Sequence, residues 1–207
     1  LIMGVLNLTP DSFSDGGKFI DLPAIKGHIE GMIEQGADLV DLGAESSRPG
    51  ARAVSREEEL GRLKPAFELL RSSFSRAPVE FSIDSQKISV IEQALNSGCT
   101  YVNNIGGVFE ASFMKELGSM KDIKYIAMHM HKTPENMQDS PIGAGELKQE
   151  IQSFLTKSSA DLQSAGFSSE RYFLDPGLGF GKTDGANLNI LLGLARWAPE
   201  HPLASGL

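Results

Sequence analysis

Short apolar runs alternate along this 207-residue chain with longer stretches in which apolar residues recur at helical spacing. The runs predict strands at Leu1–Leu6, Leu39–Leu42, Val79–Ile83, Tyr101–Val102, Tyr125–Met128, Tyr172–Leu174 and Pro202–Leu207. The stretches between them predict helices over Pro23–Gln35, Arg56–Phe74, Lys87–Asn96, Ala111–Leu117, Gly145–Ala165 and Asn187–Trp197. Several helices are followed by a glycine suited to a left-handed stop, namely Gly36, Gly98, Gly118 and Gly166.

The repeated strand–helix order predicts a parallel sheet in a single α/β domain that covers residues 1–207. A (β/α)8 TIM barrel is favoured over a doubly wound sheet, because no Gly-rich nucleotide-binding turn follows the first strand. The acidic run Glu57–Glu59 is interpreted as a solvated first helical turn, where negative charge is favourable.

Polar residues follow six of the seven predicted strands: Asn7, Asp41 with Glu45, Asp84, Asn103 with Asn104, His129 and Asp175. Each of them taken singly could be a turn or helix-cap residue, and His129 is interpreted as a core or rim histidine. All strand carboxyl ends of a parallel barrel lie on one face, where the active sites of such barrels are found. Together these residues therefore predict one polar pocket.

The chemistry of this pocket follows from its residue types. Buried carboxylates at Asp84 and Asp175, beside the amides of Asn103 and Asn104, require a ligand rich in N–H groups, such as an aminopyrimidine edge. Three further residues could bind an anion or its metal, with amide oxygen suited to Mg²⁺: Asn7, Arg48 and Lys182.

The stretch "YFLDPGLGFGKT", residues 172–183, contains alternating glycines and a Lys-Thr pair, as phosphate-binding loops do. Pro176 stands where such a loop requires its first glycine, and the dinucleotide fingerprint fails at its sixth position. We interpret the stretch as a buried strand that ends at Asp175, followed by a tight glycine-rich turn. Asp175 is then either a capping residue or a ligand-binding carboxylate.

Composition narrows the class of protein. The net charge of −8 and the pI near 5.0 argue against a nucleic-acid or membrane-surface binder. No apolar stretch approaches the roughly 20 residues of a membrane span. A single cysteine, Cys99, excludes an internal disulfide framework and predicts a buried thiol in a reducing, cytoplasmic setting.

Six motifs, in order and spacing, resemble those of the dihydropteroate synthase family: "MGVLNLTPDSFSDGG", "DLGAESSRPGA", "FSIDSQK", "VNNIGG", "MHM" and "LDPGLGFGKT". The resemblance covers residues 1–207 and implies a TIM barrel of folate biosynthesis, the target of sulfonamides. It implies condensation of 6-hydroxymethyl-7,8-dihydropterin pyrophosphate with p-aminobenzoate to 7,8-dihydropteroate and pyrophosphate. It also implies Mg²⁺ as the cofactor and a homodimer.

The same resemblance assigns roles to individual residues. It places the pterin against Asp84, Asn103, Met128 and Asp175, and Mg²⁺ with pyrophosphate at Asn7. Ser47 and Arg48 match residues that meet pyrophosphate and the p-aminobenzoate site, and the matching apolar walls for the benzoate ring are Phe13, Pro49 and Phe180. Arg48, Asp84 and Asp175 are the expected catalytic residues.

Departures from the family pattern are Ser47 for threonine, Asn104 for aspartate, and His131-Lys132 where a glycine is usual at the second position. The family's later "SRKS"-like and "RVHDV"-like stretches would come after Leu207, so we expect an incomplete barrel that is inactive as written. Two alternatives remain: a methyltetrahydrofolate-binding methyltransferase barrel, and a non-catalytic pterin-binding homologue.

Overall fold

The computed structural model describes residues 1–9, 21–46, 52–133, 136–137 and 139–197. Internal contacts divide the chain into two compact units. The first comprises Leu1–Ser46 with Arg52–Asn103, and the second comprises Ser47–Ala51 with Asn104–Leu207. The expectation of a single domain stays a prediction.

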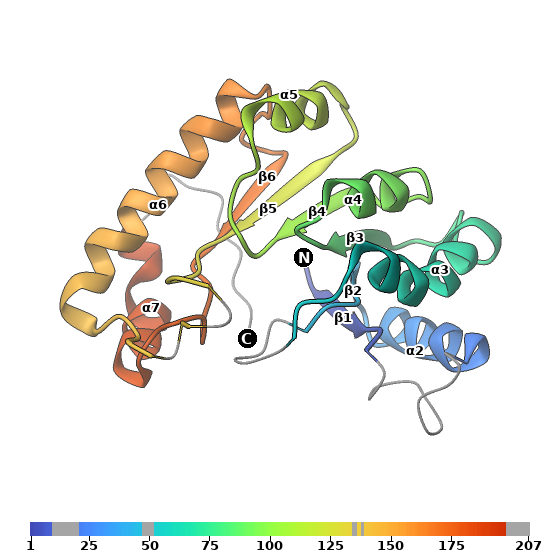
Figure 1. The fold of residues 1–207 in the computed structure, drawn as a ribbon, viewed down its shortest axis with the longest axis horizontal. Helices are drawn as coiled ribbons and strands as arrows, with labels where there is room; N and C mark the ends of the chain where they lie inside the picture. Colours follow the sequence, from blue (N-terminus) through green and yellow to red (C-terminus); the bar gives the residue numbers. More distant parts are fainter. Residues whose placement is uncertain (10–20, 47–51, 134–135, 138, 198–207) are drawn as a thin grey trace. The chain divides into compact units, whose positions relative to one another are not determined.

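Parallel strands alternate with helices in the first unit, as the periodicity predicts. Strands β1 (Met3–Asn7), β2 (Leu39–Gly43), β3 (Glu80–Asp84) and β4 (Tyr101–Asn104) lie side by side in this order. Helices α2 (Leu22–Glu34), α3 (Arg56–Ser72) and α4 (Ile88–Leu95) connect them and lie along one face of the strands (Figure 1).

The face of these strands that meets the helices is apolar and closely packed. Its buried side chains alternate along the strands: Leu6, Val40, Leu42, Phe81, Ile83 and Val102. Gly4 lies on this face because helix α2 comes very near to it, and a β-carbon at Gly4 would lie 2.6 Å from Met32 Sδ. Each strand therefore turns its other set of side chains away from the helices.

The register of the pairing positions the polar residues of that other face. Asn7 pairs with Gly43, Gly43 with Asp84, and Asp84 with Asn103. Residues paired in parallel strands point to the same side of a sheet, so these four residues form one row at the carboxyl ends. We call them the β1–β4 row.

In the second unit, β5 (Lys124–Met128) pairs in parallel with β6 (Tyr172–Asp175), with Met128 opposite Asp175. The helices of this unit are α5 (Ala111–Ser119), α6 (Ala144–Ser164) and α7 (Asp184–Trp197). The predicted strand Pro202–Leu207 lies outside the described residues. Within those residues, no helix combines the length and apolar character that a membrane span needs.

Arg171, just before β6, ties the ends of α5 and α6 together. Its guanidinium donates to the backbone carbonyls of Gly118, Met120, Ile123 and Gly166 at 2.6–3.1 Å. It also lies over the Phe167 ring, 4.8 Å from the centroid. One side chain thus binds carbonyls at the end of α5, in the turn after it and just after α6.

The glycine stops are confirmed at three of the four predicted positions. Gly36, Gly98 and Gly166 follow helices with φ of 93°, 112° and 99°. The prediction for Gly118 is wrong, because this residue lies inside α5. A β-carbon there would lie 1.9 Å from the carbonyl oxygen of Ala165, so close helix packing requires the glycine. The buried thiol predicted at Cys99 is confirmed.

Replacing Gly118 by alanine should destabilise the protein by roughly 3 kcal/mol, because the new methyl group overlaps the Ala165 carbonyl. Urea unfolding followed by circular dichroism measures the change. Gly61→Ala is the matched control, since Gly61 is an exposed helix residue with no atom within 4 Å of a new β-carbon. It should be stabilising by roughly 0.5–1 kcal/mol. Equal stability of the two variants would contradict the packing explanation.

Candidate functional site

Asn7 and Asp84 converge above Gly43 in the middle of the β1–β4 row. A β-carbon at Gly43 would lie 3.6 Å from Asn7 Oδ1 and 3.7 Å from Asp84 Oδ2. Because Gly43 has no side chain, no side chain from the strand between them separates the two oxygens. The row thus presents an amide oxygen and a carboxylate oxygen on the same side of the sheet.

Asn103, at the end of the same row, is oriented by a buried carboxylate. Its Nδ2 donates to Asp41 Oδ2 at 3.0 Å, and Asp41 is only 4 % exposed. This hydrogen bond fixes the plane of the amide, so Asn103 can offer its amide oxygen and its second N–H to a ligand. Burial raises the pKa of Asp41, while its hydrogen bond with Asn103 favours the charged form.

Asp84 lies in a strongly negative environment. Burial raises the pKa of Asp84 well above its ordinary value, and the charges of Asp41, Glu59 and Glu45 raise it further. An ionised Asp84 is therefore costly without a positive or N–H-rich partner. This property suits a carboxylate that binds a cation or a hydrogen-bond donor.

Lys87 is the cation that partly balances these charges. Its Nζ donates to Glu45 Oε2 at 2.5 Å and to Glu59 Oε2 at 2.6 Å. The prediction that the whole run Glu57–Glu59 is solvated is wrong for Glu59, which is 0 % exposed. A buried helix position can carry a carboxylate here because an ammonium group reaches it from the start of α4.

In the second unit, Asp175 ends β6 opposite Met128, as predicted for a residue at a strand end. Its Oδ1 accepts a hydrogen bond from the Gly177 amide at 2.8 Å. Burial raises the pKa of Asp175, and the Gly177 amide and the Lys182 ammonium oppose that effect. The carboxylate thus caps its own turn while part of it remains exposed, so both roles left open by the sequence are compatible with it.

The glycines after Asp175 let the backbone of residues 176–183 cross the segment that follows β5. Gly177 and Gly181 have φ of 64° and 68°, in the left-handed region. A β-carbon at Gly177 would lie 2.0 Å from the His129 carbonyl oxygen, and one at Gly181 would lie 2.6 Å from that of His131. Backbone contact therefore requires a glycine at both positions.

Lys182 stabilises the place where residues 176–183 cross the segment after β5. Its ammonium donates to the carbonyls of His129, Gly177 and Phe180 at 2.7–3.2 Å, and the residue is only 4 % exposed. Burial lowers the pKa of Lys182 to about 8, although Asp175 and Glu150 oppose this shift. The contacts of Lys182 in the structure are thus with the loop backbone, where the sequence predicts contact with an anion.

His129 is buried and shares a carboxylate with His131. Glu150 Oε1 lies 3.0 Å from His129 Nε2 and 2.8 Å from His131 Nδ1. The Phe154 ring meets the imidazole of His129 edge-on, and His129 is 7 % exposed. The interpretation of His129 as a satisfied core or rim residue therefore fits the structure, except that its Nδ1 has no partner among the described residues.

The structure explains how this chain accommodates Asn104. Its side chain accepts from Gly106 N at 2.8 Å and donates to the Tyr125 hydroxyl at 3.1 Å. It follows Asn103 directly in a strand, so it points to the opposite face and stabilises a turn.

Lys132 stands where a glycine is usual in the family pattern. It keeps a left-handed backbone, with φ of 68°. Its Nζ donates to Ser140 Oγ at 2.7 Å. The turn thus retains the conformation that a glycine would favour, at some cost in backbone strain.

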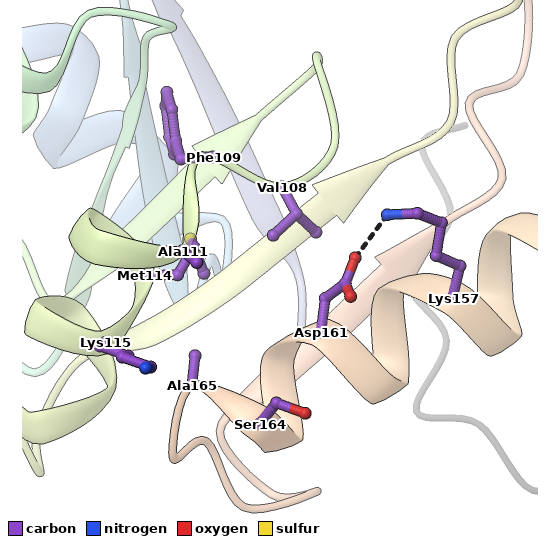
Figure 2. A pocket seen from close by; sticks show the side chains of 9 residues that line it. All are labelled: Val108, Phe109, Ala111, Met114, Lys115, Lys157, Asp161, Ser164 and Ala165. Carbon is purple, nitrogen blue, oxygen red and sulfur yellow. Dashed lines mark hydrogen bonds and ion pairs between the residues drawn. The ribbon is translucent and has the colours of Figure 1, made fainter.

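In the second unit, a cavity of about 260 Å³ lies between α5 and α6 (Figure 2). It is lined mainly by apolar side chains, with the ion pair Lys157–Asp161 at 2.6 Å on one side. No predicted site residue lines it.

Several predicted site residues lie outside the described residues: Phe13, Ser47, Arg48 and Pro49. Two groups are seen within the units, Asn7 with Asp84 and Asn103 in the first, and Met128 with Asp175, Phe180 and Lys182 in the second. The expectation that both groups form one pocket stays a prediction. Sequence reasoning missed the contact between Glu59 and Lys87, because it joins two residues far apart in the chain.

Stability should fall as the pH drops from 6.5 to 4, in part because of His129. Burial, and then the Lys182 charge, lower the pKa of His129 to about 4, although Glu150 opposes this. Between these pH values the unfolded chain binds a proton at His129 that the folded chain does not, so acid favours unfolding by up to about 3 kcal/mol. His129→Gln should flatten the fall measured by urea unfolding at several pH values. The control is His28→Gln, at an exposed helix position, and an unchanged slope in His129→Gln would contradict the assignment.

The family described as pterin binding enzyme matches residues 3–207. A dihydropteroate synthase of Clostridium beijerinckii is 37 % identical over 195 residues, which are 94 % of this chain and 68 % of that protein. A bifunctional folate synthesis protein of Pisum sativum is 38 % identical over 94 % of this chain, which spans 38 % of that longer protein.

Solved dihydropteroate synthases have the same fold. The Xanthomonas albilineans enzyme with 4-aminobenzoic acid has a TM-score of 0.85 at 33 % identity, over 100 % of this chain and 72 % of that one. The Yersinia pestis enzyme with a sulfonamide drug has a TM-score of 0.85 at 35 % identity, over 100 % of this chain and 74 % of that enzyme. The Anaplasma phagocytophilum enzyme with 6-hydroxymethylpterin-monophosphate has a TM-score of 0.82 at 37 % identity, over 99 % of this chain and 78 % of that enzyme.

These similarities confirm the predicted fold class, an α/β chain of the TIM-barrel type, and they confirm the family inferred from the six motifs. They extend over nearly the whole chain at more than 30 % identity. The chain belongs to the pterin-binding enzymes and, among them, to the dihydropteroate synthase family.

Proposed function

We propose that this chain forms the pterin-binding part of a dihydropteroate synthase. The reaction joins 6-hydroxymethyl-7,8-dihydropterin pyrophosphate to p-aminobenzoate and releases pyrophosphate. The observations that carry the proposal are two half-buried carboxylates at strand ends, Asp84 and Asp175, and in each of them burial raises the pKa. Related enzymes bound to 4-aminobenzoic acid and to a pterin monophosphate support the same pair of substrates.

The pterin ring is recognised by acceptors that match its N–H groups. Asp175 accepts hydrogen bonds from the aminopyrimidine edge, and the oxygen that Asn103 has free accepts another. Met128, in register with Asp175, contacts the ring plane. Burial makes these acceptors costly to leave unpaired, which favours a ligand that satisfies them over one that only fills the space.

The chemical step breaks the bond between the pterin methylene carbon and oxygen, and pyrophosphate leaves with the electron pair. The arylamine nitrogen then bonds to the methylene carbon and loses one proton to solvent. Asp84 acts on the positive charge that develops on the pterin between these events. A neighbouring cation lowers the pKa of Asp84, reversing the effect of burial, so the carboxylate stabilises the cation more than the neutral substrate.

The anion is held at the other end of the β1–β4 row. Asn7 faces it together with Ser47 and Arg48, while Phe13, Pro49 and Phe180 form apolar walls for the benzoate ring. Oxygen ligands suit Mg²⁺, and Asn7 Oδ1 is the amide oxygen that would hold the ion. Mg²⁺ bound there would neutralise charge on the departing pyrophosphate.

Further expectations follow from membership of the family. We propose a homodimer in the cytoplasm, with sulfonamides competing against p-aminobenzoate. The sulfonamide complex of the Yersinia pestis enzyme supports the last point.

Pyrophosphate release and dihydropteroate formation test the proposal directly, in the protein at its full natural length with Mg²⁺ and both substrates. Turnover should be lost in Asp175→Ala, because the pterin loses its main acceptor, and should persist in the control Asp122→Ala, an exposed residue. Absence of turnover in the unmodified protein would contradict the proposed synthase activity. Pterin binding that Asp175→Ala abolishes would then favour a non-catalytic pterin-binding relative.

Replacing Gly43 by alanine should weaken pterin binding about tenfold, because the methyl group enters the space between Asn7 and Asp84. The methyl would lie 3.6–3.8 Å from its neighbours, which is ordinary contact, so thermal stability should change little. Calorimetric titration with 6-hydroxymethylpterin measures the affinity. Unchanged affinity would place the pterin away from the row.

A further inference from the structure

Glu150 on helix α6 holds two histidines of the segment that directly follows β5. Its Oε1 lies 3.0 Å from His129 Nε2 and 2.8 Å from His131 Nδ1. A carboxylate oxygen accepts hydrogen bonds, so each of these ring nitrogens donates to it. One turn later on the helix, the Phe154 ring meets the His129 ring edge-on, with 5.3 Å between the centroids. Helix α6 therefore fixes the orientation of both imidazole rings.

The backbone of this histidine segment is joined to the turn that follows β6. His129 N donates to the Asp175 carbonyl at 2.8 Å, and the His129 carbonyl accepts from Lys182 Nζ at 3.2 Å. His131 N donates to the Phe180 carbonyl at 3.4 Å. The segment and the turn are thus in contact along their backbones and not only through side chains.

The contact is closest at Gly177, beside two groups of the proposed pterin site. A β-carbon at Gly177 would lie 2.0 Å from the His129 carbonyl oxygen and 3.2 Å from Met128 Cγ. The Gly177 amide also donates to Asp175 Oδ1 at 2.8 Å. A displacement of the histidine segment would therefore change the spacing of Met128 and the Asp175 carboxylate.

Helix α6 serves as a common reference, because the chain just before it pairs with the same turn. Ile142 N donates to the Gly181 carbonyl at 2.8 Å, and Thr183 N donates to the Ile142 carbonyl at 3.1 Å. The charge of Glu150, in the second turn of α6, also favours the ammonium form of Lys182, since it opposes the lowering of the Lys182 pKa by burial. The turn is thus attached to the start of α6, and Glu150 attaches the histidine segment to the same helix.

We propose that Glu150 is a positioning residue for the pterin site, which acts through His129 and His131 to set the spacing of Met128 and Asp175. The inference rests on the proposed function, because it concerns the groups that bind the pterin ring. A role in stability alone would lower the melting temperature and leave the affinity of the folded protein for the pterin unchanged.

Two substitutions at Glu150 test this role through the Kd of 6-hydroxymethylpterin, measured by calorimetric titration of the protein at its full natural length. Glu150→Ala removes the acceptor for both histidines and should raise the Kd about tenfold, because Met128 and Asp175 are no longer held at one spacing. Glu150→Gln keeps an oxygen acceptor and loses only the charge, so it should rescue part of the affinity, with a Kd raised about threefold.

Glu146→Ala is the matched control, because Glu146 is an exposed residue one turn earlier on α6 and lines the same surface hollow as Glu150. It removes an equal charge from the helix and leaves both histidine contacts in place. The Kd of this variant should stay within about twofold of the unmodified protein. Thermal unfolding shows that each variant is folded at the temperature of the titration.

A double-variant cycle shows whether Glu150 acts through His131. His131→Ala should raise the Kd about threefold. Combined with Glu150→Ala, it should add little, because the contact between the two side chains is already lost. Should Glu150→Ala not fold, Glu150→Gln and His131→Ala decide, each by the expected threefold rise over the Glu146→Ala control.

Two outcomes would overturn the inference alone. One is an unchanged Kd in both Glu150 variants with only the melting temperature lowered, which would reduce the contact to a structural one. The other is a pair of effects, from Glu150→Ala and His131→Ala, that multiply fully in the double variant, since the two residues would then act independently. Failure of the unmodified protein to bind the pterin would instead reject the proposed function, and this inference with it.

Discussion

In-register parallel pairing is the constraint on which the candidate site depends. Because β1 to β4 pair without a slip, the last residues of successive strands, Asn7, Gly43, Asp84 and Asn103, stand at the same level and on the same face. A shift of one residue in any pair would turn the polar residue toward the apolar helix face. The helices α2 to α4 prevent such a shift, since their packing needs the alternating set of Leu6, Val40 and its neighbours to stay buried.

Buried carboxylates dominate the electrostatics of the first unit, and the fold balances them only in part. Lys87 pairs with Glu45 and Glu59, whereas Asp84 is left with burial and like charges that raise its pKa. Ionised Asp84 is therefore unfavourable in the free protein, and a positive or donor-rich ligand beside it would stabilise the charged form. This imbalance would serve a reaction that generates a cation better than one that generates an anion.

Local signals in the sequence were enough for the strands, helices and polar strand ends that the structure describes. Periodicity and turn residues report on neighbours in the chain, so they located β3 and the stop at Gly98. They could not predict the burial of Glu59, because its partner Lys87 comes from another helix. The same limit applies to Gly118, which packs against the Ala165 carbonyl, and to Lys182, one of whose partners is the distant carbonyl of His129.

Arg171 couples local unfolding at the end of α5 to local unfolding at the end of α6. Its guanidinium holds carbonyls from the end of α5, the turn after it and the end of α6. Fraying of either helix breaks bonds to the same side chain, so the two ends are coupled and should exchange their amide hydrogens as one cooperative unit. Within the second unit, the end opposite Asp175 is therefore expected to open as a whole and not one helix at a time.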